Sequence, residues 1–299
     1  MVTITFSGRS KAMENTLALT SDFANVSRQS ADIKSILMRI SGAGFSHVHW
    51  CHEWNSSYLY SVHEMLQIRE WCDEYGLAVK GIHASHGESD LKRYISFNDY
   101  NRLAGIELIK NRVDLAYILN AGDIVLHLYL PWQRFEQEKN FKDDFYRVVL
   151  KSFDELEPYC KTRRVRICVE NLFDNPTVHM RYAFDLLFEH YDADFMGLCF
   201  DTGHANVSCK ENTLEFAERY NDRLFMIHAH DNNGEGDQHR IPFTGSFNWE
   251  GFAALLARSP YSFPVCLELG LGKADDETLW LKKAFEAGNR LSAMVRSAR

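Results

Sequence analysis

The 299-residue sequence lacks the features of several protein classes. No apolar run approaches the ~18 residues of a membrane-spanning helix, and no basic segment followed by a long apolar one stands at the N-terminus. We therefore expect a soluble, cytoplasmic protein without a membrane partner. Only six prolines occur, and we find no composition shift or low-complexity tract that would mark a domain boundary. This continuity predicts one domain over residues 1–299.

Paired cysteines and excess positive charge are also missing. The seven cysteines are odd in number, form no CxxC pair and lie partly within apolar runs, which favours reduced thiols over a disulfide framework or a zinc knuckle. Lys and Arg number 33 against 41 Asp and Glu, a net charge of −8. Proteins that follow nucleic-acid phosphates usually carry a basic stripe, so the charge argues against a nucleic-acid partner.

The sequence is rich in short apolar runs that alternate with amphipathic segments, a pattern typical of parallel strands with crossover helices. We predict eight strands, at Val2–Phe6, His47–Cys51, Ala78–His83, Ile124–His127, Arg166–Glu170, Met196–Asp201, Leu224–His228 and Val265–Glu268. Predicted helices are Ile33–Ile40, Tyr60–Tyr75, Tyr100–Leu119, Asp143–Cys160, Met180–His190, Leu214–Tyr220, Trp249–Ala257 and Glu277–Met294. This order predicts an α/β fold, a (β/α)8 TIM barrel. An open doubly wound sheet is the alternative, although no GxGxxG follows the first strand.

The last six predicted strands all end on residue types that bind metals. The carboxyl ends of barrel strands meet at one mouth, so these side chains should converge. They are His83, His127, Glu170, Asp201, His228 and Glu268, and nearby loops add His204, His230, Asp237 and His239. Glu170 and Glu268 each follow an apolar run, where a carboxylate is costly unless it is paired or bound to metal. The pattern therefore predicts a metal site at the mouth.

Several of these residues stand in short motifs with a family resemblance. Asp201-Thr202-Gly203-His204 and His228-Ala229-His230-Asp231-Asn232, followed by Asp237-Gln238-His239, are specific in combination. Over about residues 40–270 the sequence resembles the xylose-isomerase-like barrel superfamily, in particular its sugar phosphate isomerase/epimerase family. D-tagatose 3-epimerase-like enzymes, inosose dehydratase and, more distantly, endonuclease IV are related to that family. The sequence departs from it at Ser85, where proline is frequent, and in the loop 242–249.

The resemblance implies two alternative metal sites. In the epimerase branch it implies one divalent ion held by Glu170, Asp201, His228 and Glu268. In the nuclease branch it implies three zinc ions, with further ligands at His83, His127, His204, Asp237 and His239. All nine residues are present, so the ligand residues leave both open. Three carboxylates and one imidazole suit Mn²⁺, Mg²⁺ or Co²⁺, and Zn²⁺ also fits.

The resemblance and the carboxylate pair together predict a reaction. We expect a sugar or sugar phosphate isomerase or epimerase in which Glu170 and Glu268 remove and return a proton next to a carbonyl, through an enediolate. A keto-sugar or inosose dehydratase or lyase would begin with the same step. Phosphodiester hydrolysis and a non-catalytic sugar-binding barrel are further alternatives.

Expected substrate contacts come from residues near the strand ends. They are His83, His127, His204, His230, Arg240, Trp50, Trp54 and Trp132. For Arg240 a solvated loop charge is an equal alternative, and for the tryptophans ordinary packing. We expect a small-molecule carbohydrate as the partner, and a homo-oligomer is compatible with the sequence.

Overall fold

The computed structural model describes residues 16–24, 33–85, 93–209, 212–262 and 264–299. Within these residues, eight parallel strands form one sheet in the order β7-β6-β5-β4-β3-β2-β1-β8. They are β1 (Leu17–Thr20), β2 (His47–Trp50), β3 (Ala78–His83), β4 (Asp123–His127), β5 (Arg166–Glu170), β6 (Met196–Asp201), β7 (Leu224–His228) and β8 (Val265–Leu267). An isolated bridge between Ala229 and Leu267 joins β7 to β8. The sheet is therefore a nearly closed barrel.

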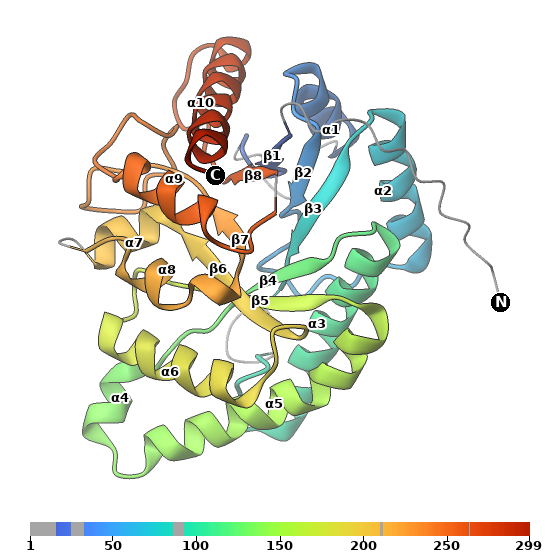
Figure 1. Cartoon of the computed structure of the whole chain (residues 1–299). Coiled ribbons are helices and arrows are strands. Elements are labelled where there is room, and N and C mark those ends of the chain that lie inside the picture. The colour runs from blue at the N-terminus through green and yellow to red at the C-terminus, as the bar shows by residue number, and fades with distance from the viewer. Residues whose placement is uncertain (1–15, 25–32, 86–92, 210–211, 263) are drawn as a thin grey trace.

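Helices follow the strands and lie outside them (Figure 1). They are α1 (Ile33–Gly42), α2 (Val62–Glu74), α3 (Asp99–Ile118), α4 (Trp132–Gln137), α5 (Phe141–Arg163), α6 (Thr177–His190), α7 (Thr202–Ser208), α8 (Glu215–Arg219), the 3₁₀ turn η2 (Asn221–Arg223), α9 (Trp249–Ala257) and α10 (Glu277–Ala298). Capping residues in the local sequence determine where several of these helices begin. Ser61 and Glu64 form a capping box at α2, and Asn98 and Asp276 cap α3 and α10. The expected TIM barrel is confirmed.

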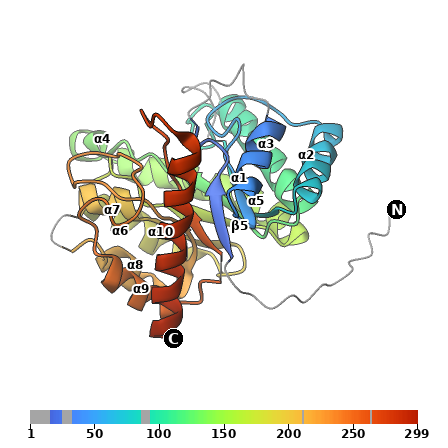
Figure 2. The same cartoon turned by 90° about the horizontal axis from the view of Figure 1, so that it is seen from above.

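The first strand is not where the sequence pattern placed it. The predicted strand Val2–Phe6 lies outside the described residues, and β1 is formed by Leu17–Thr20. β1 pairs with β2 on one side and β8 on the other. Figure 2 shows α10 alongside β1, and a Cβ on Gly288 of α10 would lie 3.0 Å from the Leu17 side chain. This close packing covers the strand that completes the ring.

Strand alternation builds a polar layer over an apolar one inside the barrel. Residues two apart on a strand face the same side. Val125, Cys168, Cys199 and Met226 form a fully buried interior cluster on β4 to β7. Two residues further along these strands stand His127, Glu170, Asp201 and His228. The apolar cluster is thus the floor below a group of titratable side chains.

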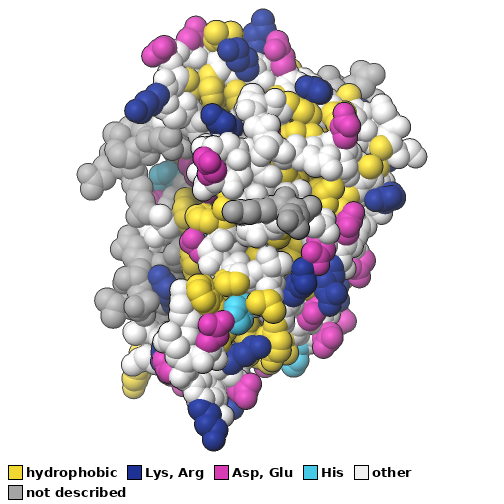
Figure 3. All heavy atoms as spheres, turned by 90° about the vertical axis from the view of Figure 1, so that its left-hand side faces the viewer, with side chains coloured by type: hydrophobic (Ala, Val, Ile, Leu, Met, Phe, Trp, Pro, Cys, Tyr) yellow, Lys and Arg dark blue, Asp and Glu magenta, His cyan; other side chains and the backbone are white. Residues whose placement is uncertain are grey.

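The surface and the helices add two observations. On the face in Figure 3, Lys and Arg side chains are interspersed with Asp and Glu and form no continuous basic stripe. None of the helices in the described parts of the chain is long and apolar enough to cross a membrane.

Candidate metal centre and substrate cavity

Four side chains from successive strand ends meet at the centre of the mouth. Glu170, Asp201, His228 and Glu268 each offer a ligand atom, and these atoms lie within 4.8 Å of one another. His228 Nδ1 lies 3.3 Å from Glu170 Oε1 and 3.0 Å from Glu268 Oε2. Asp201 and His228 are fully buried and Glu170 is buried. The four ends of β5 to β8 therefore enclose one point.

The donor set fits a divalent metal ion. His228 Nδ1 is buried, has no hydrogen-bond partner among the described residues and faces the carboxylates, so its lone pair would point at the ion once Nδ1 has lost its proton. Three carboxylates with one imidazole form a hard, oxygen-rich set that suits Mg²⁺, Mn²⁺ or Co²⁺ and also admits Zn²⁺. These four residues would hold the ion.

The charges of Glu170, Glu268 and His228 depend on burial and on neighbouring groups. Burial acts to raise the pKa of Glu170, but His228 and His127 outweigh it and hold the pKa well below its ordinary value. Burial also opposes ionisation of Glu268, and His228 again lowers its pKa. Burial acts to lower the pKa of His228, but Cys199 and the two glutamates hold it well above the ordinary value. The proton on His228 must leave before its Nδ1 can bind a metal.

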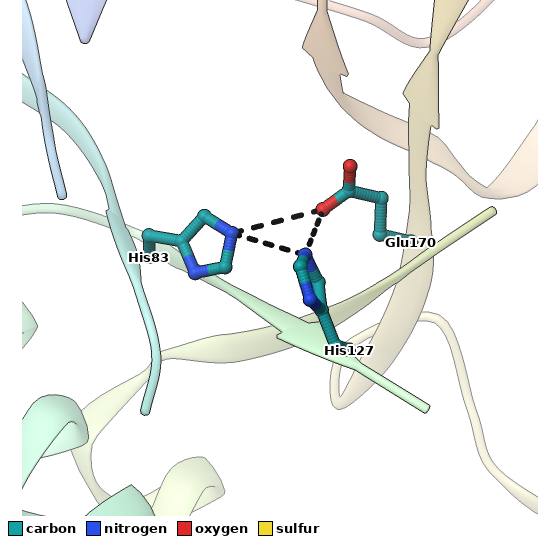
Figure 4. Close-up of side chains that lie close together, drawn as sticks. All are labelled: His83, His127 and Glu170. Carbon is teal, nitrogen blue, oxygen red and sulfur yellow. Dashed lines mark hydrogen bonds and ion pairs between the residues drawn. The ribbon is translucent and has the colours of Figure 1, made fainter. Parts of the chain in front are cut away.

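A second group adjoins the first through Glu170. The side chains of His83, His127 and Glu170 point toward one another from β3, β4 and β5 (Figure 4). The Nε2 atoms of the two histidines are 3.2 Å apart, and His127 Nε2 is 3.0 Å from Glu170 Oε2. Burial, and next the charge of His127, lower the pKa of His83 to about 3, which keeps His83 neutral. These three residues also form a candidate metal group.

A third group comes from the loop after β7 and the start of α7. His239 Nε2 lies 2.9 Å from Asp237 Oδ2, and His204 Nε2 lies 3.4 Å from the same oxygen. Burial opposes the charge of His239, but its hydrogen bond with Asp237 raises its pKa to about 10. A backbone bridge between Asp231 and Arg240 holds the two ends of this loop together. The loop thereby brings Asp237 and His239 to the mouth.

These groups surround a cavity of about 410 Å³. Its walls are Asp22, Trp54, His83, His127, Tyr129, Glu170, Leu172, Phe173, Asp174, His204, Asp237, Gln238, His239, Glu268, Leu269, Gly270 and Gly272. The lining residues that the structure describes include five carboxylates and no Lys or Arg. A cavity of this volume has the size of a small-molecule site.

Comparison with known proteins identifies the family of this barrel. Residues 38–285 match the family described as the xylose isomerase-like TIM barrel. The chain belongs to this family. A relative from Sinorhizobium fredii, the uncharacterized protein y4fM, is 32% identical over 284 residues, which are 89% of this chain and 91% of the relative.

Two solved structures share the fold of this xylose isomerase-like barrel. A D-tagatose 3-epimerase-like protein aligns with a TM-score of 0.72 and 20% identity, covering 95% of this chain and 98% of that one. A D-psicose 3-epimerase, solved in the presence of D-fructose, aligns with a TM-score of 0.69 and 18% identity, covering 95% and 99%. At these identities the likeness shows the fold.

The structure divides the expected substrate contacts of this family member. His83, His127, His204 and Trp54 line the cavity. The Trp54 ring lies 4.6 Å from that of His83 and 5.3 Å from that of His127, between centroids. Trp54 therefore forms an apolar wall beside the histidines.

Four other expected contacts, Trp50, Trp132, Arg240 and His230, are absent from the described cavity walls. Trp50 is fully buried and donates to the hydroxyl of Tyr60 at 3.1 Å. Trp132 begins α4 and stacks on His179. The exposed Arg240 is held by its backbone, and the fully buried His230 places Nε2 3.0 Å from both oxygens of Asp201. His230 thus contacts the Asp201 carboxylate directly, and together with His239 and Glu268 it also forms a candidate metal group.

Sequence reasoning also missed several lining residues. Asp22 follows β1, so the misplaced first strand hid it. Phe173 and Asp174 stand three and four residues after the end of β5, and Tyr129 two after the end of β4. The Tyr129 hydroxyl lies 2.9 Å from His127 Nδ1. These residues could have been predicted by considering the positions directly after the end of each strand as well as the last residue of the strand.

Proposed function

We propose that this protein is a divalent-metal-dependent isomerase or epimerase of sugars that works by moving a proton next to a carbonyl group. One observation carries the proposal. Of the four residues in the central group, Glu170 and Glu268 line the cavity, whereas Asp201 and His228 lie fully buried beside them. Two carboxylates are therefore accessible to a substrate. The other two ligands, Asp201 and His228, are buried and would hold the ion from the protein side.

The two glutamates have the properties of proton-transfer groups. Their lowered pKa values keep both ionised at neutral pH, so either can take a proton from the carbon next to a carbonyl. A bound divalent ion would supply polarisation of that carbonyl and so acidify the proton. Isomerisation can use one glutamate for both transfers. Epimerisation needs a proton on the opposite face, which the second glutamate could deliver after it has taken up a proton from water, while the first glutamate returns its proton to water.

The cavity favours an uncharged sugar over a sugar phosphate. Its described walls carry five carboxylates and no Lys or Arg, and phosphate groups in proteins are usually met by these cations or by backbone amides. Imidazoles of His83, His127 and His204 can exchange hydrogen bonds with hydroxyls, and Trp54 offers an apolar surface to a sugar ring. The shared fold with the two epimerase structures supports the same substrate class.

Proton exchange in deuterated water tests this function. The metal-loaded protein, incubated with a panel of free ketoses and keto-inositols, should introduce deuterium at the carbon next to the carbonyl of its substrate. Glu170→Gln and Glu268→Gln should each lower exchange or turnover by at least about 10²-fold while the circular dichroism stays unchanged. Near-normal turnover in either variant would contradict the two-carboxylate mechanism. Loss of a hydroxyl from the product would instead identify a dehydratase or lyase.

A second candidate function is metal-dependent phosphodiester hydrolysis. The second and third groups of side chains favour this function, because they would supply ligands for two further metal ions. Their residues line the same cavity as Glu170 and Glu268, and are His83, His127, His204, Asp237 and His239. The acidic cavity and the net charge of −8 oppose it. Elemental analysis of the purified protein separates the two functions. One ion per chain supports the isomerase, whereas three ions with tight, salt-sensitive binding of abasic duplex support the hydrolase.

A further inference from the structure

A seventh imidazole lies directly below the central group of four residues, on a strand that contributes none of its ligands. His49 of β2 is fully buried, and its Nε2 atom is 3.3 Å from Nε2 of His228. The two rings are 5.0 Å apart between centroids and inclined by 69°, so His49 approaches the edge of His228 that points away from the carboxylates. His49 is absent from the cavity walls.

The sheet is shaped to admit this ring. Pairing between β2 and β3 is shifted between Val48 and His49, so that His49 stands opposite Gly81. A Cβ on Gly81 would lie 3.2 Å from His49 Nδ1, 2.9 Å from Met226 Cε and 3.2 Å from the carbonyl oxygen of Asp123. Such distances are too short for an unstrained side chain. A glycine and a bulge together leave room for His49 in the apolar floor of the barrel.

With a metal bound to Nδ1 of His228, the contact would determine which nitrogen of each ring carries hydrogen. His228 presents Nδ1 to the carboxylates, so metal binding requires a lone pair on Nδ1 and a hydrogen on Nε2. That hydrogen can then be donated to Nε2 of His49 only if His49 is neutral and bears its own hydrogen on Nδ1. Metal-binding histidines usually donate their second nitrogen to a carboxylate, a carbonyl or water. Here the acceptor is another imidazole.

We propose that His49 is a positioning residue that accepts a hydrogen bond from Nε2 of His228 and so fixes the orientation and tautomer with which His228 binds the metal. This inference rests on the metal site of the proposed function. This role explains why a polar imidazole occupies a buried position, which packing alone does not explain. His49 Nδ1 makes no hydrogen bond with the described residues, and a buried unpaired N–H opposes folding. An apolar side chain would fill the space without that penalty.

Metal titration of His49 variants tests the proposal without any sugar. His49→Leu removes the acceptor, and the dissociation constant for Mn²⁺, measured by calorimetry on the full chain, should rise about 10- to 100-fold. His49→Gln keeps an acceptor oxygen near the position of Nε2 and should recover most of the affinity. The matched control is His47→Gln on the same strand, because His47 contacts Ser46 and not the metal group, and its affinity should equal the wild-type value.

Two further measurements separate positioning from a general role in packing. In the Co²⁺-loaded protein, the shifted and exchangeable N–H proton of His228 should be visible in wild type and His49→Gln and should be lost to exchange in His49→Leu. Without metal, His49→Leu should melt no lower than wild type. If His49→Leu does not fold, His49→Met replaces it.

The outcomes distinguish this inference from the proposed function. Unchanged Mn²⁺ affinity in His49→Leu, beside normal wild-type binding, overturns the role of His49 alone. A lower melting temperature of metal-free His49→Leu together with no recovery in His49→Gln also overturns it, since both would follow from a packing defect. A wild-type protein that binds no divalent ion overturns the metal site and this inference together.

Discussion

At the scale of single residues, the groups behind the ligands decide how the ligands point. His230 must carry its hydrogen on Nε2 to donate to the oxygens of Asp201, and its ring stacks on that of His239 at 4.2 Å between centroids. Gly203 in α7 lies against the same ring, and a Cβ there would collide with the imidazole of His230. Gly203 is therefore required by close approach, not by backbone conformation.

This close approach gives a test of the support for Asp201. Gly203→Ala should push His230 away from Asp201 and raise the metal dissociation constant about 10- to 100-fold, as loss of a ligand's hydrogen-bond partner typically does. Titration with Mn²⁺ measures this change. Gly236→Ala in the loop after β7 is the control, because nothing lies within 4 Å of a Cβ there and its φ is not positive. Equal affinities in the two variants would refute the role given to His230.

At the scale of elements, α3 holds the loop that carries Trp54 into the mouth. The fully buried guanidinium of Arg112 donates to the carbonyl oxygens of Glu53 and Tyr58, each at 3.0 Å, and lies 4.6 Å from the centre of the Tyr60 ring. These carbonyls flank Trp54 in the chain. A helix on the outside of the barrel thus fixes one wall of the cavity.

Removal of the guanidinium should weaken both the fold and this wall. Arg112→Met leaves two carbonyl oxygens without their partner, and we expect the free energy of unfolding to fall by about 2–4 kcal/mol. Urea denaturation measures the loss, and a red-shifted tryptophan emission would report greater exposure of Trp54. The exposed pair of Arg147 with Asp144 supplies the control, since Arg147→Met should change stability by less than about 0.5 kcal/mol. A similar small change in Arg112→Met would contradict this account.

The elements also show what the sequence could predict. Strands β2 to β8 lie within one residue of their predicted bounds, because each is an apolar run bounded by polar residues. Parallel pairing then brings their ends together, which made the central group predictable. β1 was misplaced, since the four residues of Leu17–Thr20 give little pattern to recognise. The face of the strand on which a side chain lies was harder to predict than the bounds of the strand. His49 and Trp50 are neighbours, and strand alternation places the first next to His228 inside the barrel and the second next to Tyr60 outside it.

At the scale of the whole molecule, the metal group spans the weakest join of the barrel. Full ladders connect β1 to β8 and β1 through to β7, but between β7 and β8 the described backbone shows one isolated bridge, with hydrogen bonds of 3.0 and 3.3 Å. His228 ends β7 and Glu268 follows β8, so they stand on opposite sides of this join. A metal held by both would close the ring that the backbone leaves nearly open.

Metal removal should therefore weaken the junction between β7 and β8 and lower the stability of the whole barrel. At a metal concentration 100 times the dissociation constant, binding contributes about 2.7 kcal/mol, or about 5 °C in melting temperature for a chain of this size. Because the raised pKa of His228 means that a proton must leave on binding, this increment should shrink as the pH falls.

Hydrogen exchange after chelation should rise in β7 and β8 and stay unchanged in β2 and β3. Asp201→Asn, which removes a ligand away from the join, should abolish the increment in melting temperature. Uniform exchange in all strands after chelation would show instead that the metal does not close the barrel.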